Sequence, residues 1–571
     1  MVIAASLLLF AISSIGFWEL LQKYSKVDVL FLPSLTIAVQ VGALFAGGLL
    51  NLLPEVTYLL YAAGFFGFAV SAYQAKSLVF LKKYCNIGFL FLAAMALFVL
   101  LRLPGQRFIA YDNFSHWALV VKCMLETNRF PNFQDTLIAF KDYPLGSSVY
   151  IYFFAKLVGT AEPIQMFAQA YTILASIVPV FFFAKRNRWA AFALTVVTTH
   201  VILGYNIGLR DLSVDTLLPM VAVAAMLYFV VYCRSMEQPA AFFLGGFYLV
   251  QLMQIKNSGV FFVLMILVGM FVTTRSWQRA GWNAMVAAMP LLSSLLWKKH
   301  TAYVFSEAST SKHAMTLENY SAVFAGKTPE QIKSICRDML IFTVSWVQVW
   351  MVFAVLAVVA VLWVVYNKKQ RKQALQMLLG AVAVYAVYQL CTLAMYLFSM
   401  PIGEALVLAS HERYTKTILG VFLMLALVML VKLLSELTAK KSVAFSTALA
   451  TASLLGYVFV AQIQPWFEMK VPDSMQKRIW LETIQNEYQL PVGESYFVLH
   501  PEDKSFLRYM CRYVLSSEVK ELVNPTVEDL NKISSKYILI YQNDSQVVDE
   551  WIKENFPDQY GNPVIIRENI A

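Results

Sequence analysis

The sequence predicts an all-α polytopic membrane protein that ends in a small α/β domain outside the bilayer. Of the 571 residues, 59% are hydrophobic and 14% are charged. The apolar residues gather in blocks close to the ~20 residues that a helix needs to cross a bilayer. After residue 463 charges become frequent, and short apolar runs alternate with helical patterns. This change of pattern predicts the final domain.

About fourteen apolar blocks are expected to cross the membrane within a domain covering residues 1–463. The blocks are residues 2–21, 29–50, 56–75, 86–103, 164–184, 189–205, 216–233, 239–255, 260–274, 283–297, 339–366, 374–397, 414–433 and 443–463. We treat the first block as a membrane helix, because it lacks the basic start and the small-residue cleavage site of a signal peptide.

Lys and Arg residues are concentrated in the short connections between the blocks, as at 185–188, 368–372 and 440–441. Such basic connections stay in the cytoplasm, so they set the orientation and explain the net charge of +10 without nucleic acid as a partner. The loops 104–163 and 298–338 are then external. Counting residues 146–160 as a further crossing would place the basic 185–188 cluster on the outer side of the membrane. We therefore expect 146–160 to lie along the outer interface, with its tyrosines Tyr150 and Tyr152 at headgroup depth.

The final domain, residues 464–571, is predicted to be α/β and extracytoplasmic. Its expected strands and helices are strands at 496–500 and 537–541 and helices at about 504–515, 526–534 and 546–555. It carries neither a GxGxxG sequence nor a nucleophile elbow, so the sequence assigns it no chemistry.

The predicted orientation brings ionisable residues together on the outer face, whereas the middles of the spans are almost free of them. The outer residues are Asp112, His116, Arg210, Asp211, Asp215, Lys256, Lys312, His313, Glu404, His411, Glu412 and Arg413. Transporters usually place their binding charges near the bilayer midplane. The one-sided pattern therefore favours chemistry at the outer interface.

These residue types suit transfer of a sugar from a lipid phosphate, which needs a base for the attacking hydroxyl and cations for the leaving phosphate. Asp112 is the predicted base, with His116 beside it. The predicted phosphate ligands are Arg413, Lys256, Lys312, His313 and His411. The predicted acceptor site or second acidic site comprises Asp211, Asp215, Glu404 and Glu412.

Ordinary structural roles remain open for the same residues. Asp112 also fits the N-cap of a helix beginning at Phe114. His116 fits three roles: orienting Asp112, binding phosphate, or standing at the interface. Asp211 and Asp215 share a helix face through their spacing of four, although Asp211 also fits a pair with Arg210. Arg413 also fits a membrane anchor.

The motifs resemble those of bacterial membrane glycosyltransferases of the GT-C superfamily, in particular multispanning proteins of Gram-positive bacteria. The likeness covers residues 103–435 and, loosely, the final domain. It rests on an acid in the first large outer loop (Asp112), on Tyr143-Pro144-Leu145-Gly146 before the next helix, on an Asp near the outer end of a later span, and on Glu412-Arg413-Tyr414.

This resemblance implies an irregular GT-C-like helical bundle with an external cavity, a polyprenyl-phosphate sugar as donor, and Asp112 as the base or its neighbour. Many members have two adjacent acids where this chain has Asp112-Asn113. The single acid weakens the case for a divalent metal ion, which prefers several oxygen ligands, and leaves metal binding undecided. The six cysteines show no ligand spacing, and Gly326-Lys327-Thr328 lacks the earlier glycine of a P-loop.

The sequence thus predicts a glycosyltransferase of the bacterial plasma membrane that moves a sugar from a polyprenyl-phosphate donor to a cell-envelope glycan acceptor. Two other readings remain. A flippase or exporter of lipid-linked saccharides would need polar residues through the spans, and the sequence lacks them. An envelope polysaccharide polymerase or ligase would use similar outer residues and would differ only in its products.

Overall fold

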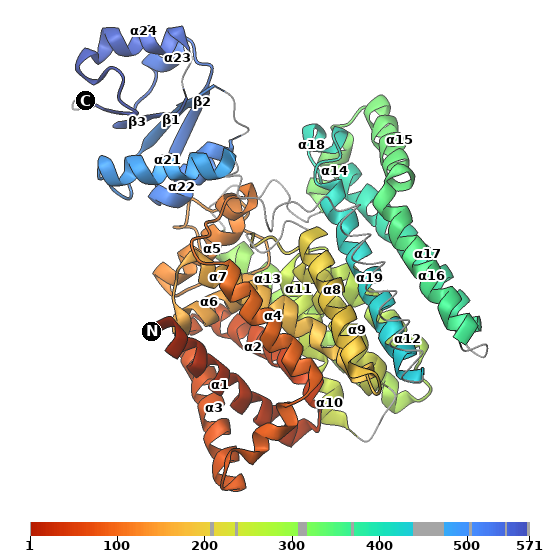
Figure 1. Cartoon of the computed structure of the whole chain (residues 1–571). Coiled ribbons are helices and arrows are strands. Elements are labelled where there is room, and N and C mark those ends of the chain that lie inside the picture. Colours follow the sequence, from red (N-terminus) through yellow and green to blue (C-terminus); the bar gives the residue numbers. More distant parts are fainter. Residues whose placement is uncertain are drawn as a thin grey trace.

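In the computed structural model, the described residues are 2–205, 211–233, 238–305, 317–366, 371–437, 473–501, 505–542 and 545–567. Helices between residues 2 and 437 form one bundle, and the chain from residue 473 onward forms a small α/β domain on one end of it (Figure 1). The two parts share a continuous apolar core, in which Phe108 and Phe114 of the bundle contact Tyr513 of the domain.

Seven helices among the described residues are long and apolar enough to cross a membrane. They are α1 (Val2–Ser25), η1 with α2 (Val29–Leu49), α3 (Leu53–Ala75), α7 with η4 (Glu162–Phe183), α16 (Val347–Tyr366), α17 (Arg371–Phe398) and α19 (His411–Glu436). An eighth is reached if η2 (Leu78–Tyr84) and α4 (Ile87–Arg102), which meet at 88°, count as one span.

The other predicted crossings in the described residues are helical, but by length and composition they do not qualify as spans. They are α8 (Arg188–Tyr205), α9 (Leu217–Tyr232), α10 (Pro239–Leu244) with α11 (Gly246–Ile255), α12 (Gly259–Val272) and α13 (Trp277–Val304). The block predicted at 443–463 lies outside the described residues. The prediction of a mostly helical chain with several helices able to span a membrane and a small α/β domain is therefore confirmed, whereas the predicted number of crossings is not.

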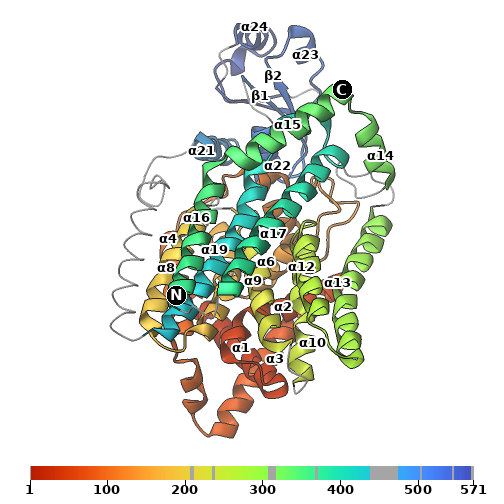
Figure 2. The ribbon, with the colours of Figure 1, turned by 90° about the vertical axis from the view of Figure 1, so that its right-hand side faces the viewer.

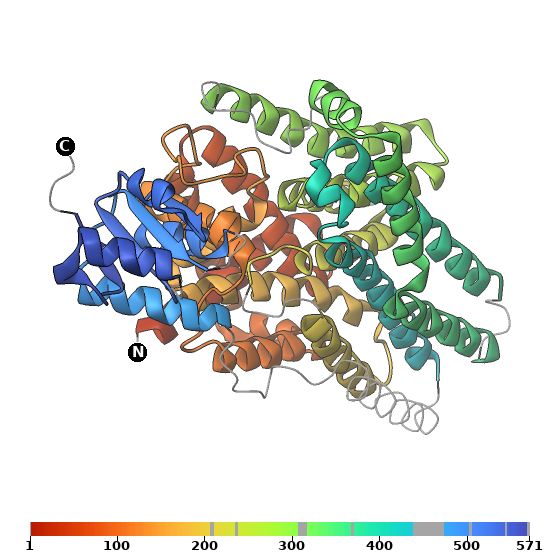
Figure 3. The ribbon, with the colours of Figure 1, turned by 90° about the horizontal axis from the view of Figure 1, so that it is seen from above.

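The helices differ in how much of them the bundle covers. Most of α7 and α19 is buried, whereas only 33% of the apolar stretch of α16 and 22% of that of α17 is buried and many of their exposed residues are apolar, as expected of helices that face lipid. Figure 2 shows α16 and α17 along the outside of the bundle, in front of α19. Seen from above, the bundle extends well beyond the area that the C-terminal domain covers (Figure 3). The buried helix α19 carries Arg413, so this predicted site residue lies within the bundle rather than on its lipid-facing side.

Contacts at the end of the bundle away from the C-terminal domain bring the basic connections together. The Asn187 amide donates to the Leu434 carbonyl at 2.6 Å, next to the 185–188 cluster. The Arg279 guanidinium donates to the Tyr232 carbonyl at 3.2 Å, and the Asp28 N–H donates to the Tyr232 hydroxyl at 2.8 Å. The opposite end of α19, which begins at His411, and of α9, which begins at Leu217, therefore faces the C-terminal domain.

Helix α6 (Gly146–Val158) begins and ends at the domain-facing end, so it does not run the length of the bundle. At its start, a Cβ on Gly146 would come within 2.7 Å of Gln254, so only glycine allows this close approach to α11. At its other end, Glu162 bonds Arg478 of the domain. The sequence predicts that its tyrosines contact lipid headgroups, but their side chains are not exposed to the surroundings. Tyr150 and Tyr152 are buried against neighbouring helices, including α2 and α7.

The C-terminal domain holds a four-stranded sheet of order β2-β1-β3-β4, parallel except for β4. The strands are β1 (Tyr496–His500), β2 (Val519–Val523), β3 (Tyr537–Ile540) and β4 (Val564–Ile566). Helices α21 (Asp473–Glu487) and α22 (Phe506–Leu515) cover one face, and α23 (Val527–Asn531) and α24 (Gln546–Asn555) cover the other (Figure 1). Both predicted strands are confirmed. Strands β2 and β4 and helix α21 were not predicted.

Candidate functional site

Asp112 lies at the start of an unusual turn. It precedes η3 (Asn113–Trp117), a single π-helical turn that leads into α5 (Ala118–Thr127). Such turns are rare and often occur at functional sites. The Asp112 side chain makes no capping hydrogen bond to η3, so it does not fill the capping role that the sequence also allowed. Its carboxylate instead accepts a hydrogen bond from the Arg413 guanidinium at the start of α19.

Four of the predicted residues form one ion-pair network, which we call the charge network: Asp112, Arg413, Asp215 and Lys256. Arg413 bridges the two carboxylates, with Nη1 on Asp112 and Nη2 at 3.2 Å from Asp215 Oδ2. Lys256 Nζ donates to Asp215 Oδ1 at 2.9 Å. The four side chains come from four separate stretches of the chain, and the structure brings them to the domain-facing end of the bundle.

The charge network is open at one end and closed at the other. The side chains of Asp112 and Arg413 are 28% and 27% exposed, whereas Asp215 is 5% exposed. Burial raises the pKa of Asp215, but Lys256 and Arg413 outweigh burial, and the pKa lies below its usual value. Asp215 is therefore ionised near neutral pH. Two carboxylates then balance two cations, and the pair accessible to a ligand is Asp112 with Arg413.

Asp211 lies beside the charge network and behaves differently. Its burial raises the pKa to about 6, although the Ser213 N–H that donates to its carboxylate at 2.9 Å acts in the opposite direction. Asp112 also raises this pKa through like charge, and Arg413 lowers it. Asp211 is thus partly protonated near neutral pH, unlike Asp215, which is four residues away.

Two residues that the sequence analysis did not single out as site residues hold the segment carrying Asp211 and Asp215. The Asn113 side-chain oxygen accepts from the Leu212 N–H at 3.0 Å. The Gln169 amide of α7 donates to the Ser213 carbonyl at 3.0 Å. Asn113 occupies the position where the resemblance expects a second acid, and it fixes backbone there instead. Gln169 gave a usable signal, since a glutamine inside an apolar helix needs a polar partner.

His116 is enclosed by aromatic rings. Its ring centre lies 4.7 Å from Trp117, 5.0 Å from Tyr143 and 6.0 Å from Phe140. Burial lowers its pKa to about 3, so it is neutral at physiological pH. Neither ring nitrogen bonds a described residue, so the structure shows no contact through which it would orient Asp112 or hold a phosphate.

Two further predicted residues, both on α19, contact residues outside the charge network. His411 Nε2 lies 3.1 Å from Gln389 Oε1, and the histidine ring packs 4.5 Å from Phe342. Glu412 pairs with Lys416 one turn along α19. Glu404 lies in the short helix α18 (Ile402–Leu406). Arg210, Lys312 and His313 lie outside the described residues.

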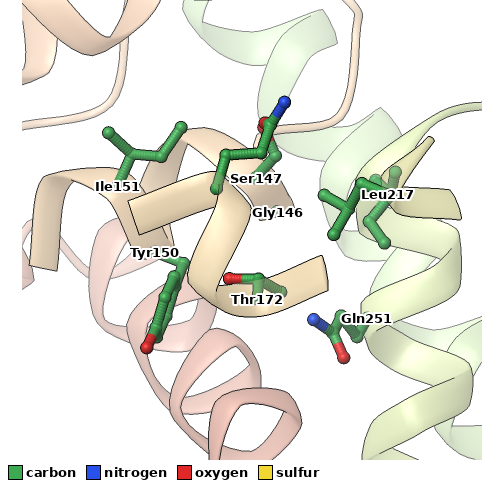
Figure 4. Close-up of a pocket in the computed structure, with 9 residues that line it drawn as sticks. Gly146, Ser147, Tyr150, Ile151, Thr172, Leu217 and Gln251 are labelled. Carbon is green, nitrogen blue, oxygen red and sulfur yellow. The ribbon is translucent and has the colours of Figure 1, made fainter. Parts of the chain in front are cut away.

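A small cavity lies between α6, α7, α9 and α11 (Figure 4), and its lining residues Leu217 and Ile255 are close in sequence to Asp215 and Lys256. Its volume of about 10 Å³ admits one water molecule and no sugar. Ser147 and Gln169 line it, and Ser147 Oγ and Gln169 Oε1 have no partner among the described residues, as expected of groups that bind an ordered water. The partly exposed Asp112–Arg413 pair, in contrast, is open to a larger ligand.

Among the described residues, no group of three or more His, Cys, Asp or Glu side chains is arranged so that it could hold a metal ion. The two carboxylates of the charge network already engage Arg413 and Lys256. Their oxygens therefore fit a cationic side chain better than a divalent ion, which would add its own repulsion to the two cations.

Comparisons of the chain with protein-family models, with curated proteins and with solved structures each found no match. A functional assignment therefore depends on the residues of this chain and on their arrangement.

Proposed function

We propose that this protein is a GT-C-type glycosyltransferase of the bacterial plasma membrane that transfers a sugar from a polyprenyl-phosphate donor to a cell-envelope glycan acceptor. In this proposal about fourteen helices cross the bilayer, and the charge network, the loops 104–163 and 298–338 and the domain 464–571 are extracytoplasmic. The observation that carries it is the convergence of Asp112, Arg413, Asp215 and Lys256 at the end of the bundle opposite the basic connections.

Arg413 and Lys256 are proposed to hold the donor phosphate. The guanidinium offers a planar pair of donors that suits phosphate oxygens, and the lysine adds a compact cation. Lys256 lies 4.9 Å from the ring centre of Tyr414, within the range of a cation–π contact that would limit its movement. Asp215 keeps both cations in place from the buried side.

Asp112 is proposed to act as the general base. Its carboxylate would take the proton of the acceptor hydroxyl while that oxygen bonds the anomeric carbon of the sugar. The bond from this carbon to the phosphate oxygen breaks, and the lipid phosphate leaves with the electron pair. Arg413 and Lys256 would stabilise the charge that develops on the leaving phosphate.

The test is turnover of a panel of radiolabelled polyprenyl-phosphate sugars by membranes that contain wild type, Asp112→Asn or Glu528→Gln at matched expression. Glu528→Gln is the control, because Glu528 is exposed on the C-terminal domain and pairs with Lys532 four residues along the chain. We expect transfer by wild type and the control and its loss in Asp112→Asn, with donor still bound. Equal activity in Asp112→Asn would remove Asp112 from the chemistry. Movement of lipid-linked sugar across the bilayer without turnover would instead support a flippase, and repeated addition to the product a polymerase.

A further inference from the structure

Helix α22 of the C-terminal domain packs directly against the loop that carries Asp112. The ring of Tyr111 lies 5.2 Å from that of Tyr509, edge to face. The ring of Phe114 lies 5.5 Å from that of Tyr513. Asp112 thus lies between two side chains, one before and one after it, that both contact α22. Aromatic pairs of this kind contribute about 0.5–1.5 kcal/mol each beyond the area they bury.

A buried polar cluster strengthens the same contact. Glu162, at the start of α7, accepts from the Phe108 N–H at 2.6 Å, from the Tyr513 hydroxyl at 3.2 Å and from the Arg478 guanidinium at 2.8 Å. Arg478 is 7% exposed, so this pair is shielded from solvent. On the other side of Tyr513, Lys122 Nζ donates to its carbonyl at 2.6 Å. One carboxylate therefore joins the loop before Asp112, the bundle and the C-terminal domain.

One contact between the bundle and this loop involves a group that the reaction would disturb. Asp112 contacts the bundle through Arg413, and Arg413 is the group proposed to turn toward the donor phosphate. Once that happens, the Asn113 bond to Leu212, the Glu162 bond to the Phe108 N–H and the packing against α22 still hold the loop.

We propose that α22 is the positioning element of the Asp112 loop, and that Tyr509 and Tyr513 are its positioning residues. The effect of α22 on turnover rests on the proposed function, whereas its effect on the position of the loop does not. The C-terminal domain then acts on the base through Tyr111 and Phe114, so its attachment to the bundle is a requirement for turnover.

The test compares full-length Tyr509→Ala and Tyr513→Ala with Tyr509→Phe and Tyr513→Phe, which keep the rings. Tyr513→Phe loses only the hydroxyl bonded to Glu162. Lys532→Ala is the matched control, since Lys532 lies exposed on the far side of the sheet and pairs with the exposed Glu528. Tyr513 is buried, so Tyr513→Ala could fail to fold. Tyr509 is only half-buried, so Tyr509→Ala tests the same contact with less risk to folding.

Hydrogen exchange of peptides spanning 108–118 is the first readout, and donor-dependent turnover is the second. In the alanine variants we expect faster exchange in 108–118, unchanged protection of β1 and β3, and kcat lower by about 10- to 100-fold with donor KM unchanged. The phenylalanine variants and Lys532→Ala should match wild type.

Unchanged exchange in 108–118 would overturn the inference, and so would faster exchange with full kcat. A fall in donor affinity instead of kcat would also overturn it, because α22 would then act on binding rather than on the base. If wild type transfers no sugar from any donor, the proposed function fails, while the exchange measurement still decides whether α22 positions the loop.

Discussion

Replacing Asp112 by asparagine is expected to strengthen the binding of a polyprenyl phosphate while it abolishes transfer. In the structure Arg413 Nη1 is occupied by the Asp112 carboxylate, so a phosphate arriving at Arg413 competes with that carboxylate for the same donor. Asparagine keeps the size of the side chain but removes its charge. The neutral asparagine therefore competes less strongly with the phosphate for Arg413, although the general base is lost.

The size of the effect follows from the exposure of the pair. Both side chains are a little more than one quarter exposed, which lies between a solvated ion pair and a buried one. Solvated pairs contribute up to about 1 kcal/mol and hydrogen bonds to charged groups about 1.5–3 kcal/mol. Taking about 1–2 kcal/mol for this pair, binding of the lipid phosphate should tighten by about 5- to 30-fold.

The assay is a titration of purified protein in lipid nanodiscs with polyprenyl phosphate that carries no sugar, so that turnover cannot interfere. Glu528→Gln is the control, and Arg413→Gln should remove most of the binding. A dissociation constant for Asp112→Asn equal to or weaker than that of the wild type would refute the reasoning, because Arg413 would then not be shared between carboxylate and phosphate.

Three further outcomes are expected from the electrostatics of the site. Asp215→Asn leaves Lys256 and Arg413 facing a neutral group and should lower the free energy of unfolding by about 3–5 kcal/mol, measured by denaturant titration in detergent. Asp211→Asn should cost less than about 1 kcal/mol in the same titration, since the amide oxygen still accepts the Ser213 N–H; an equal loss in both would contradict the charge network. Wild type should lose more thermal stability than His116→Phe as pH falls below 6.5, because the folded pKa of about 3 lets protons bind first to the unfolded chain. Asp211, whose pKa of about 6 acts in the opposite sense, is present in both proteins, so their difference reports His116.

The residues of the charge network could be predicted one by one from the sequence. Charged side chains beside apolar spans are costly, so Asp112, Asp215, Lys256 and Arg413 stood out against their surroundings. What the sequence could not supply was their pairing, because each comes from a different stretch and their contacts depend on how the helices pack. The bridge that Arg413 makes between two carboxylates therefore became visible only in the fold.

Helix geometry distinguishes two nearby residues of α19 that the sequence predicted for the same phosphate-binding role. His411 and Arg413 are two residues apart, a rotation of about 200° along α19. Arg413 therefore meets Asp112, whereas His411 meets Phe342. Which face of a helix meets which neighbour depends on packing, and a single sequence does not determine it.

The missed elements have comparable causes. Strand β2 is an edge strand, and Lys520 and Glu521 interrupt its apolar pattern. Charged residues are common on edge strands because they discourage pairing with other chains. The charges of the later loops indicated an interfacial helix at residues 146–160. The short helix α6 is nevertheless covered by its neighbours, and this burial depends on contacts with parts of the chain distant in sequence.

The two roles proposed for the charge network conflict in the resting arrangement, and this conflict orders the reaction. The Asp112 oxygen that accepts from Arg413 is not free to take a proton from an acceptor hydroxyl, while a guanidinium that donates to Asp112 is not free for phosphate. Binding of the donor phosphate resolves both, since it engages Arg413 and frees the Asp112 oxygen. An acceptor hydroxyl that arrived first would meet a base already occupied. Donor binding should therefore precede activation of the acceptor, and the contact of α22 with the loop keeps Asp112 in place during that exchange.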